Sequence, residues 1–353
     1  MRTLAYNIIL LTILTIGSVE LRAAKRTEVE KRKSIEKTYQ VTKNHLLDIT
    51  NKFGRVHINT WDKSQIDVNI EMIARGRNDA RAEDLLNKIE IRISDSGSLL
   101  KFETDLKGSF NNKKSETFEI NYTVNMPKVN PLNLKNSFGS AYLGDLEGRL
   151  DLNISYGDVT AEKLTGDSKI KISFGEGELD MVKEGDVTIK YSDVDIEEIG
   201  DIDLEQGYSD VTVEKAGDIE VTCKYGQLEI EELTGASGYI GFSDFEIGDL
   251  HKSLDLETAY SGGFKVDKVK KGFERIVLQG KFGAFRLGLE EGLNGTFDAD
   301  LKFADLNHSD ADIELTYKIK GDTKSTYKGK IGNGTGGNIS VTSSYGDVKF
   351  FRR

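Results

Sequence analysis

The chain has 353 residues, a formal net charge of −11, and 36 glycines against only 2 prolines. This acidic balance excludes a nucleic-acid-binding protein, because such a protein needs a basic surface to meet phosphates. An apolar content of 37% together with so much glycine is typical of a folded chain with many tight turns and not of a disordered one.

The N-terminal segment has the layout of a secretory signal peptide. A short basic start precedes an uncharged apolar run at residues 8–19, and small residues follow at Ala23 and Ala24. A run of this length is too short to span a bilayer comfortably. We predict that residues 1–24 are a signal peptide, with an uncleaved anchor as the alternative, and that the mature chain starts near Ala24 or Lys25. No cysteine lies near the segment, which excludes a lipoprotein anchor.

Residues 25–135 predict an irregular β region that caps the rest of the chain. One short helix is expected where Ala and Leu cluster without β-branched residues, at residues 79–86. The polar stretch 107–114 indicates an exposed loop. Strand-like apolar runs appear at residues 66–72, 88–93, 99–103 and 118–125. Irregular units of this kind are expected at an end that shields the first regular repeat.

A repeat governs the chain from residue 136 onward. An aromatic residue followed by Gly, Ser or Ala recurs at a nearly constant interval through the middle of the chain and at a slightly longer interval later. The aromatic positions are Phe138, Tyr156, Phe174, Tyr191, Tyr208, Tyr225, Phe242, Tyr260, Phe282, Phe303 and Tyr345, with an isolated earlier copy at Phe53. The last gap, from Phe303 to Tyr345, is twice as long as the gap before it, so we predict that one aromatic has been lost there.

Apolar residues alternate with period two on both sides of each aromatic. Val194 and Ile196 follow Tyr191, and Val221 and Cys223 precede Tyr225. This alternation predicts two short strands per repeat, each with one buried face, joined by a corner at which the aromatic points inward. Residues 136–353 are thus predicted to form a single-stranded parallel β-helix (a β-solenoid) with 17–22-residue coils and an inward aromatic ladder, in an all-β protein. An antiparallel sandwich or barrel is the alternative.

The repeat motif is similar to that of a known family. A lone Phe53-Gly54 copy, a Met126-Pro127 step after an apolar strand, and many (Tyr/Phe)-(Gly/Ser)-Asp-Val repeats resemble the putative-adhesin β-helix family of unknown function in exported bacterial proteins, especially those of the Bacteroidetes. The resemblance covers roughly residues 40–350. It implies a β-helical protein of the periplasm or cell surface, and it supplies no catalytic or binding residues.

The sequence shows no recognisable catalytic motif. A nucleophile elbow, a phosphate loop and a dinucleotide fingerprint are all absent. The four histidines, His45, His57, His251 and His308, do not lie at metal-ligand spacing from another His, Cys or carboxylate. We expect no zinc and no cofactor. The single cysteine, Cys223, lies in an apolar row and is expected to be a small buried hydrophobe.

Two outward rows of acidic residues are the one candidate site. The row six residues after each aromatic is Glu162, Asp180, Glu197, Glu214 and Glu231, and the row two residues after it is Asp158, Glu176, Asp193, Asp210, Gln227 and Asp244. In stacked repeats the members lie about 5 Å apart, which costs about 0.8 kcal/mol per neighbouring pair in water. Ca²⁺, the nearby Lys163 and Lys215, or a basic partner would relieve this repulsion. The alternative is a solvated face that prevents lateral aggregation, and turn chemistry alone explains Asp in the second row.

Three functions remain open on the sequence. The first is a non-enzymatic, adhesin-like scaffold of the periplasm, outer membrane or cell exterior. It would present rigid faces to an envelope or surface partner, protein or glycan, and would not be an integral membrane protein after signal removal. The second is a self-assembling β-helical polymer. The third is a polysaccharide-active enzyme, which the short repeats disfavour because they leave no room for the long loops that form a cleft. We expect that the protein is not an enzyme.

Overall fold

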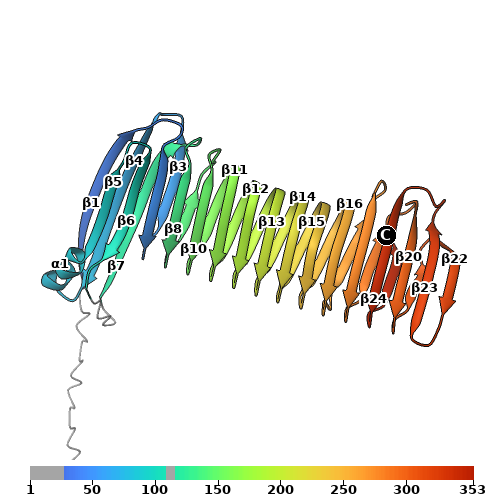
Figure 1. Cartoon of the computed structure of the whole chain (residues 1–353). Coiled ribbons are helices and arrows are strands. Elements are labelled where there is room, and N and C mark those ends of the chain that lie inside the picture. Colours follow the sequence, from blue (N-terminus) through green and yellow to red (C-terminus); the bar gives the residue numbers. More distant parts are fainter. Residues whose placement is uncertain (1–27, 109–115) are drawn as a thin grey trace, which may run out of the picture.

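The computed structural model describes residues 28–108 and 116–353. The predicted signal peptide and most of the predicted loop 107–114 lie outside the described residues. The described chain is all-β, with one long mixed sheet of 25 strands and a nine-residue helix, α1 (Asp79–Asn87). Figure 1 shows the strands side by side along one long axis. In the described ranges no helix has the length and hydrophobicity needed to cross a bilayer.

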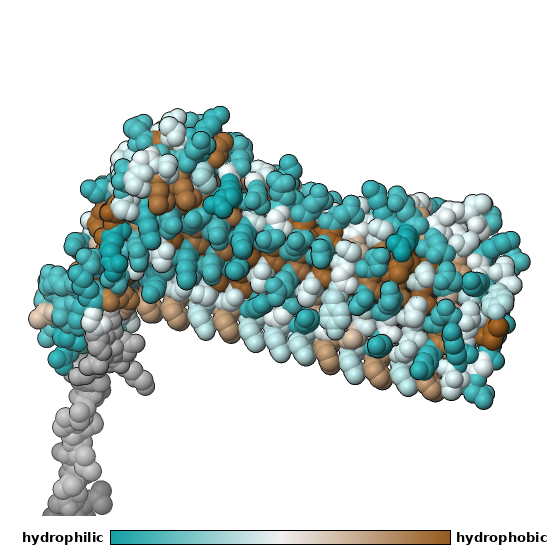
Figure 2. Space-filling model, viewed as in Figure 1, coloured by the Kyte–Doolittle hydropathy of each residue, from teal (hydrophilic) through white to brown (hydrophobic). Residues whose placement is uncertain are grey.

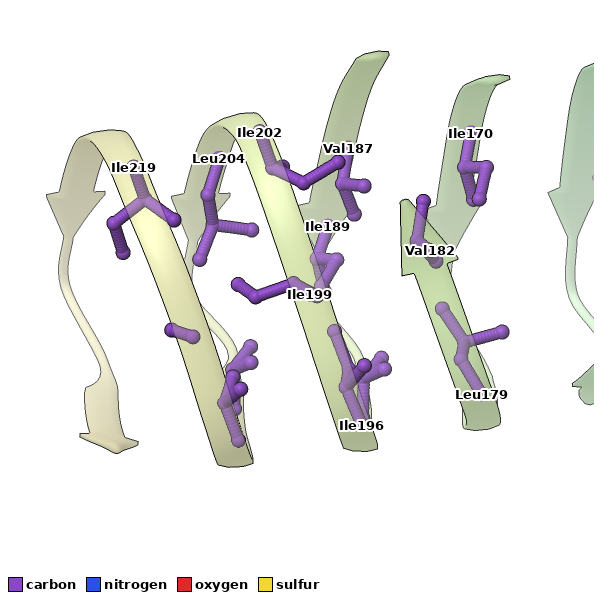
Figure 3. Close-up of a cluster of buried hydrophobic side chains, with 14 of the residues drawn as sticks. Ile170, Leu179, Val182, Val187, Ile189, Ile196, Ile199, Ile202, Leu204 and Ile219 are labelled. Carbon is purple, nitrogen blue, oxygen red and sulfur yellow. The ribbon is translucent and has the colours of Figure 1, made fainter. Parts of the chain in front are cut away.

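Six long strands form the regular middle of the molecule, and each pairs in parallel with the next. They are β11 (Val159–Ser173), β12 (Glu176–Lys190), β13 (Asp193–Gly207), β14 (Asp210–Lys224), β15 (Gln227–Gly241) and β16 (Asp244–Ala259). Figure 3 shows ribbons that arch from one side of the stack to the other, with the labelled apolar side chains gathered between them. In β13 both halves contribute to this core, since Ile196, Ile199 and Leu204 are each 2% exposed. The period-two alternation therefore predicted the buried faces correctly.

The corner of each repeat differs from the prediction. Every repeat aromatic has a left-handed backbone, with φ between 50° and 60°, and its side chain is about half exposed. The next residue points inward instead: Ser192 and Ser209 are each 4% exposed, and their Oγ atoms donate to the carbonyls of Lys190 and Gly207 at 3.0 Å. The left-handed turn rotates the ring outward and brings the small residue inside. The ladder is confirmed, and its predicted inward direction is wrong.

The N-terminal part extends the same sheet with irregular and partly antiparallel strands. They are β1 (Val29–Gln40), β2 (Leu46–Lys52), β3 (Val56–Trp61), β4 (Gln65–Gly76), β5 (Ile89–Asp95), β6 (Leu99–Leu106), β7 (Thr117–Pro127), β8 (Leu132–Ser137), β9 (Ala141–Leu143) and β10 (Leu150–Ser155). The helix and the four strands predicted in this region are confirmed as α1, β4, β5, β6 and β7. Helix α1 contacts β1, β4 and β5 and buries Ala82, Leu85 and Leu86. Strand β2 pairs in parallel with β8, and β3 with β9, so the sheet runs without a break into the regular repeats.

The C-terminal strands are stacked out of sequence order. They are β17 (Phe264–Val269), β18 (Arg275–Lys281), β19 (Phe285–Leu289), β20 (Gly295–Lys302), β21 (Leu306–Asp310), β22 (Ile313–Lys320), β23 (Lys324–Ile331), β24 (Gly337–Ser344) and β25 (Val348–Arg352). Strand β24 lies between β18 and β20 and is parallel to both, and β25 lies in the same way between β19 and β21. The last repeat of the sequence therefore fills a gap inside the stack.

This order corrects the prediction of a lost aromatic. Tyr345 stacks between Phe282 and Phe303, with ring centroids 5.0 Å from each. The long gap in the sequence contains β22 and β23, which pair with each other and continue the sheet antiparallel to β20. No rung of the ladder is missing between Phe282 and Phe303.

Candidate binding surfaces

Twelve aromatic side chains form a continuous exposed row, here called the aromatic ridge. In stacking order they are Phe53, Phe138, Tyr156, Phe174, Tyr191, Tyr208, Tyr225, Phe242, Tyr260, Phe282, Tyr345 and Phe303. Successive ring centroids are 4.7–5.0 Å apart, and the ring planes differ by 2–14°. Figure 2 shows the ridge as a projecting row of pale and brown residues along the lower edge of the molecule. The ridge is a continuous exposed aromatic surface along the stack.

Because the ridge points outward, removing one of its rings should lower the free energy of unfolding by less than removing a buried ring would. Tyr208→Ala opens no enclosed cavity, because the ring is 53% exposed. It removes two ring contacts, to Tyr191 at 5.0 Å and Tyr225 at 4.8 Å, which stabilise by about 0.5–1.5 kcal/mol each. We therefore expect a loss of about 1–3 kcal/mol in the free energy of unfolding, measured by urea denaturation.

Two variants control this measurement. Tyr208→Gly should be about 1 kcal/mol less harmful than the alanine variant, because glycine adopts φ = 53° without steric cost. Glu214→Ala, which removes an exposed carboxylate from the sheet face, should leave the urea midpoint unchanged. A loss above about 4 kcal/mol for Tyr208→Ala would instead indicate a fully buried ring.

The predicted acidic rows lie on the outer face of the first halves of β11–β16. Glu197 on β13 lies beside Glu214 on β14, because the residues before and after them are paired as Ile196↔Val213 and Glu198↔Lys215. The same register aligns the whole candidate row, Glu162, Asp180, Glu197, Glu214 and Glu231. Glu162 accepts a hydrogen bond from the Tyr142 hydroxyl, which raises the pKa of that phenol. Among the described residues 148–245 the single ion pair is Lys190–Glu205 at 2.9 Å, so Lys163 and Lys215 form no ion pair with the row.

The row two residues after each aromatic has a structural role that the sequence did not reveal. The carboxylate of Asp158 accepts the backbone N–H of Glu176 at 3.1 Å, and that of Asp210 accepts the N–H of Gln227 at 3.1 Å. The carboxylate of Asp347 likewise accepts the N–H of Asp305 at 2.8 Å. These aspartates link one repeat to the next. In the part of the chain that the structure describes, no group of three His, Cys, Asp or Glu side chains is placed to hold a metal ion.

We expect the thermal midpoint to be indifferent to calcium. Millimolar CaCl2, compared with NaCl at equal ionic strength, should leave the midpoint unchanged, because the carboxylates form single-file rows without a clustered ligand set. Replacing Glu197 and Glu214 together with glutamine should raise the midpoint slightly, since it relieves like-charge stacking. A calcium-dependent rise that this double variant abolishes would restore the metal-binding hypothesis.

A hollow beside Trp61 was not predicted. It has a volume of about 470 Å³, and its apolar lining includes Val41, Trp61, Pro127 and Val129. Lys63 lies over the Trp61 ring, with its Nζ 4.4 Å from the ring centroid. The sequence signal for this hollow was the only tryptophan of the chain, at a strand end. Lys63 therefore covers one face of the Trp61 ring.

The cysteine and the histidines pack as ordinary structural side chains. Cys223 is fully buried, as predicted, and burial raises the pKa of its thiol. His57 stacks on Tyr142 with ring centroids 4.3 Å apart, and its Nε2 lies 2.9 Å from the Asn59 side-chain oxygen. His251 and His308 lie on other strands, β16 and β21. Within the described residues the histidines are therefore dispersed.

Comparison with known proteins returns solved structures only. No family model matches the chain, and no curated protein matches it. A putative adhesin from Bacteroides fragilis NCTC 9343 is 13% identical, with a TM-score of 0.30, over 90% of this chain and 97% of that one. A putative adhesin from Parabacteroides distasonis ATCC 8503 is 11% identical, with a TM-score of 0.32, over 73% and 97%. A putative cell adhesion protein from Clostridium sporogenes ATCC 15579 is 10% identical, with a TM-score of 0.21, over 92% and 100%.

Proposed function

We propose that the chain is an exported, non-enzymatic parallel β-solenoid that works as an adhesin-like scaffold. The observation that carries this proposal is the regularity of the stack: β11–β16 pair in parallel along nearly their whole length. Their connections are only two residues long, such as Phe174-Gly175 and Tyr191-Ser192. Such a stack is suited to presenting flat, rigid faces to a partner, protein or glycan. It has no long loops between these strands from which a polysaccharide-cleaving site is commonly built.

The strands at the two ends of the stack support a scaffold over an end-to-end polymer. Lys33 and Lys37 of β1 face the inner side, since they pair with the buried Met72 and Val68 of β4. At the other end, a register shift in β22 turns Lys320 toward the inner side, where it pairs with Asp305 at 2.8 Å. Inward-pointing charges on edge strands prevent further strand pairing. Stacking of a second molecule on either end would bury these lysines.

The scaffold proposal is tested by location and by binding without turnover. We expect the protein in envelope or extracellular fractions with an N-terminus near Ala24 or Lys25. On a glycan array and on isolated envelope material it should bind without releasing products, and electron microscopy should show short particles. Unprocessed Met1 protein in the soluble cytoplasm would contradict export. Product release would support the enzyme, and filaments would support the polymer.

A further inference from the structure

The aromatic ridge, half phenylalanine and half tyrosine, exposes a larger continuous aromatic surface than a monomer ordinarily carries. Its twelve side chains are each 36–53% exposed. Since an aromatic side chain buries about 150–250 Å² when covered, the ridge leaves on the order of 1,000 Å² of ring surface in water. The largest apolar patch on a typical monomer is about 300–600 Å², and each partner in a stable interface contributes about 800 Å². The ridge therefore has the area of a protein–protein interface.

The orientation of the rings restricts what can cover the ridge. From Phe138 to Tyr345 both faces of every ring are covered by the neighbouring rings, so only ring edges reach the solvent. At one end the edge of Phe118 packs against Phe53, with centroids 5.3 Å apart at 64°. A sugar or flat ligand that stacks on ring faces finds none along this stretch. A straight row of edges with a repeat of 4.7–5.0 Å is matched in spacing by an identical row, that is, by a second copy of the chain.

Opposite charges lie on the two sides of the ridge. The residue before the ridge aromatic is Lys52, Lys190, Lys224, Lys281 or Lys302, and at the other rungs it is Ser, Gly or Ala. The residue two positions after the aromatic is Asp158, Glu176, Asp193, Asp210, Asp244 or Asp347 at six of the rungs, and at a seventh it is Asp305, which Lys320 of the same chain already pairs. All of these charged side chains are exposed. The ridge is therefore flanked by lysines on the strand that enters each corner and by carboxylates on the strand that leaves it.

We propose that two copies of the chain pair in parallel through the aromatic ridge, about a twofold axis that runs along the stack. In this arrangement each rung meets the same rung of the second copy, and the lysine flank of each copy faces the carboxylate flank of the other. Antiparallel pairing would oppose carboxylates to carboxylates, which is unfavourable. An anionic membrane surface is disfavoured for the same reason. The pairing leaves the outer sheet faces of both copies free, so it goes beyond the scaffold role and does not depend on the partner that those faces bind.

Cysteine cross-linking tests both the pairing and its direction. Tyr156→Cys and Phe282→Cys place thiols seven rungs apart on the ridge. Under mild oxidation each variant alone should form a disulfide-linked dimer, and a mixture should give few 156–282 links by mass spectrometry. Glu178→Cys, on the sheet face, is the matched control and should stay uncross-linked, as should the wild type with its buried Cys223. Predominant 156–282 links would overturn the parallel arrangement.

A charge exchange across the ridge gives a second test. Asp193→Lys should weaken dimerisation, measured by sedimentation at low salt, by about tenfold, because it opposes Lys190 of the other copy with a like charge. Adding Lys190→Glu should restore the wild-type affinity, while circular dichroism confirms that both variants fold. Wild-type affinity in Asp193→Lys would overturn the proposed flank contacts. A wild-type protein that stays monomeric at all concentrations would overturn the dimer. This holds equally if the monomer floats with phosphatidylcholine vesicles, because the ridge would then bind a lipid surface.

Discussion

Phe350→Ala is expected to lower the free energy of unfolding by about 3–5 kcal/mol, although Phe350 lies only three residues from the C-terminus. Phe350 is fully buried, and its ring packs edge-on against Phe297 with centroids 5.3 Å apart. Its strand, β25, is hydrogen-bonded on both sides, to β19 and to β21. The last strands of a stack built in sequence order would have one free edge and would tolerate such a change better. Urea denaturation of the purified variant measures the loss.

The neighbouring residue supplies the control. Phe351 has the same side chain on the outer side of β25, where Lys349 and Arg353 lie over its ring at 6.0 and 5.5 Å. We expect Phe351→Ala to change stability by less than about 1 kcal/mol. Deletion of residues 337–353 should be more severe than either substitution, because it leaves a gap one repeat wide and should make residues 295–331 sensitive to proteolysis. Equal stability of the two alanine variants would contradict the inserted position of β25.

Asn136→Ala is expected to cost about 2–4 kcal/mol, because it leaves the buried carbonyl of Gly139 without a donor and removes one of the two donors to the carbonyls of Gly54 and Ser140. The Asn136 amide is fully buried and donates to the backbone oxygens of Gly54, Gly139 and Ser140 at 3.0, 2.7 and 3.2 Å. Its side-chain oxygen accepts from Asn51 at 3.2 Å. These contacts join the coil of β2 and β3 to the next one at the aromatic corner. Denaturant unfolding of the variant measures the loss.

Asn133 provides a matched comparison on the same strand, β8. Its side-chain oxygen is buried and has no hydrogen-bond partner in the described chain. Asn133→Ala therefore removes an unsatisfied polar atom and should be neutral or slightly stabilising. If Asn136→Ala were as mild as Asn133→Ala, the amide would not be serving the corner carbonyls.

The strands and corners of the regular middle could be predicted because they rest on local rules. Alternation with period two located the strands, and the nearly constant spacing of the aromatics from Phe138 to Tyr260 located the corners. The direction of the aromatic could not be read in the same way. The inward–outward alternation shifts by one residue at the corner. This shift is compatible either with an inward ring or with an inward small residue after it. The left-handed backbone at the aromatic rotates the ring outward, and stacking on both ring faces offsets the cost of that backbone.

Polar residues at otherwise apolar positions were the missed signal. Asn51, Asn136 and Gln206 stand two residues before a ridge aromatic, a position that holds Ile172 and Ile189 in two of the regular repeats. All three are buried and donate to backbone carbonyls at the corner. An amide in an apolar row indicated carbonyls that face the interior.

The order of the C-terminal repeats was beyond local reasoning. The gap between Phe303 and Tyr345 is compatible with two successive repeats. Nothing in its length shows that β24 lies between β18 and β20 instead of following β23 at the end of the stack. Pairing of β24 with both β18 and β20 is a contact between segments far apart in sequence. The one local sign is the turn before β24, where Gly332, Gly334 and Gly336 all have positive φ. Such glycines allow a tight return but do not specify its destination.

Distances along one row of outward residues test the stacked arrangement most directly. The registered partners run Thr160, Glu178, Asp195, Thr212, Glu229, Glu246, Lys265, Arg286, Lys349 and Asn307. Spin labels at Thr160 and Glu229 are four steps apart, and labels at Thr160 and Asn307 are nine steps apart. At about 4.8 Å per step, pulsed electron paramagnetic resonance on protein diluted with unlabelled chain should give about 19 Å and about 43 Å. A 160–307 distance below about 30 Å, or one close to the 160–229 distance, would contradict a single linear stack.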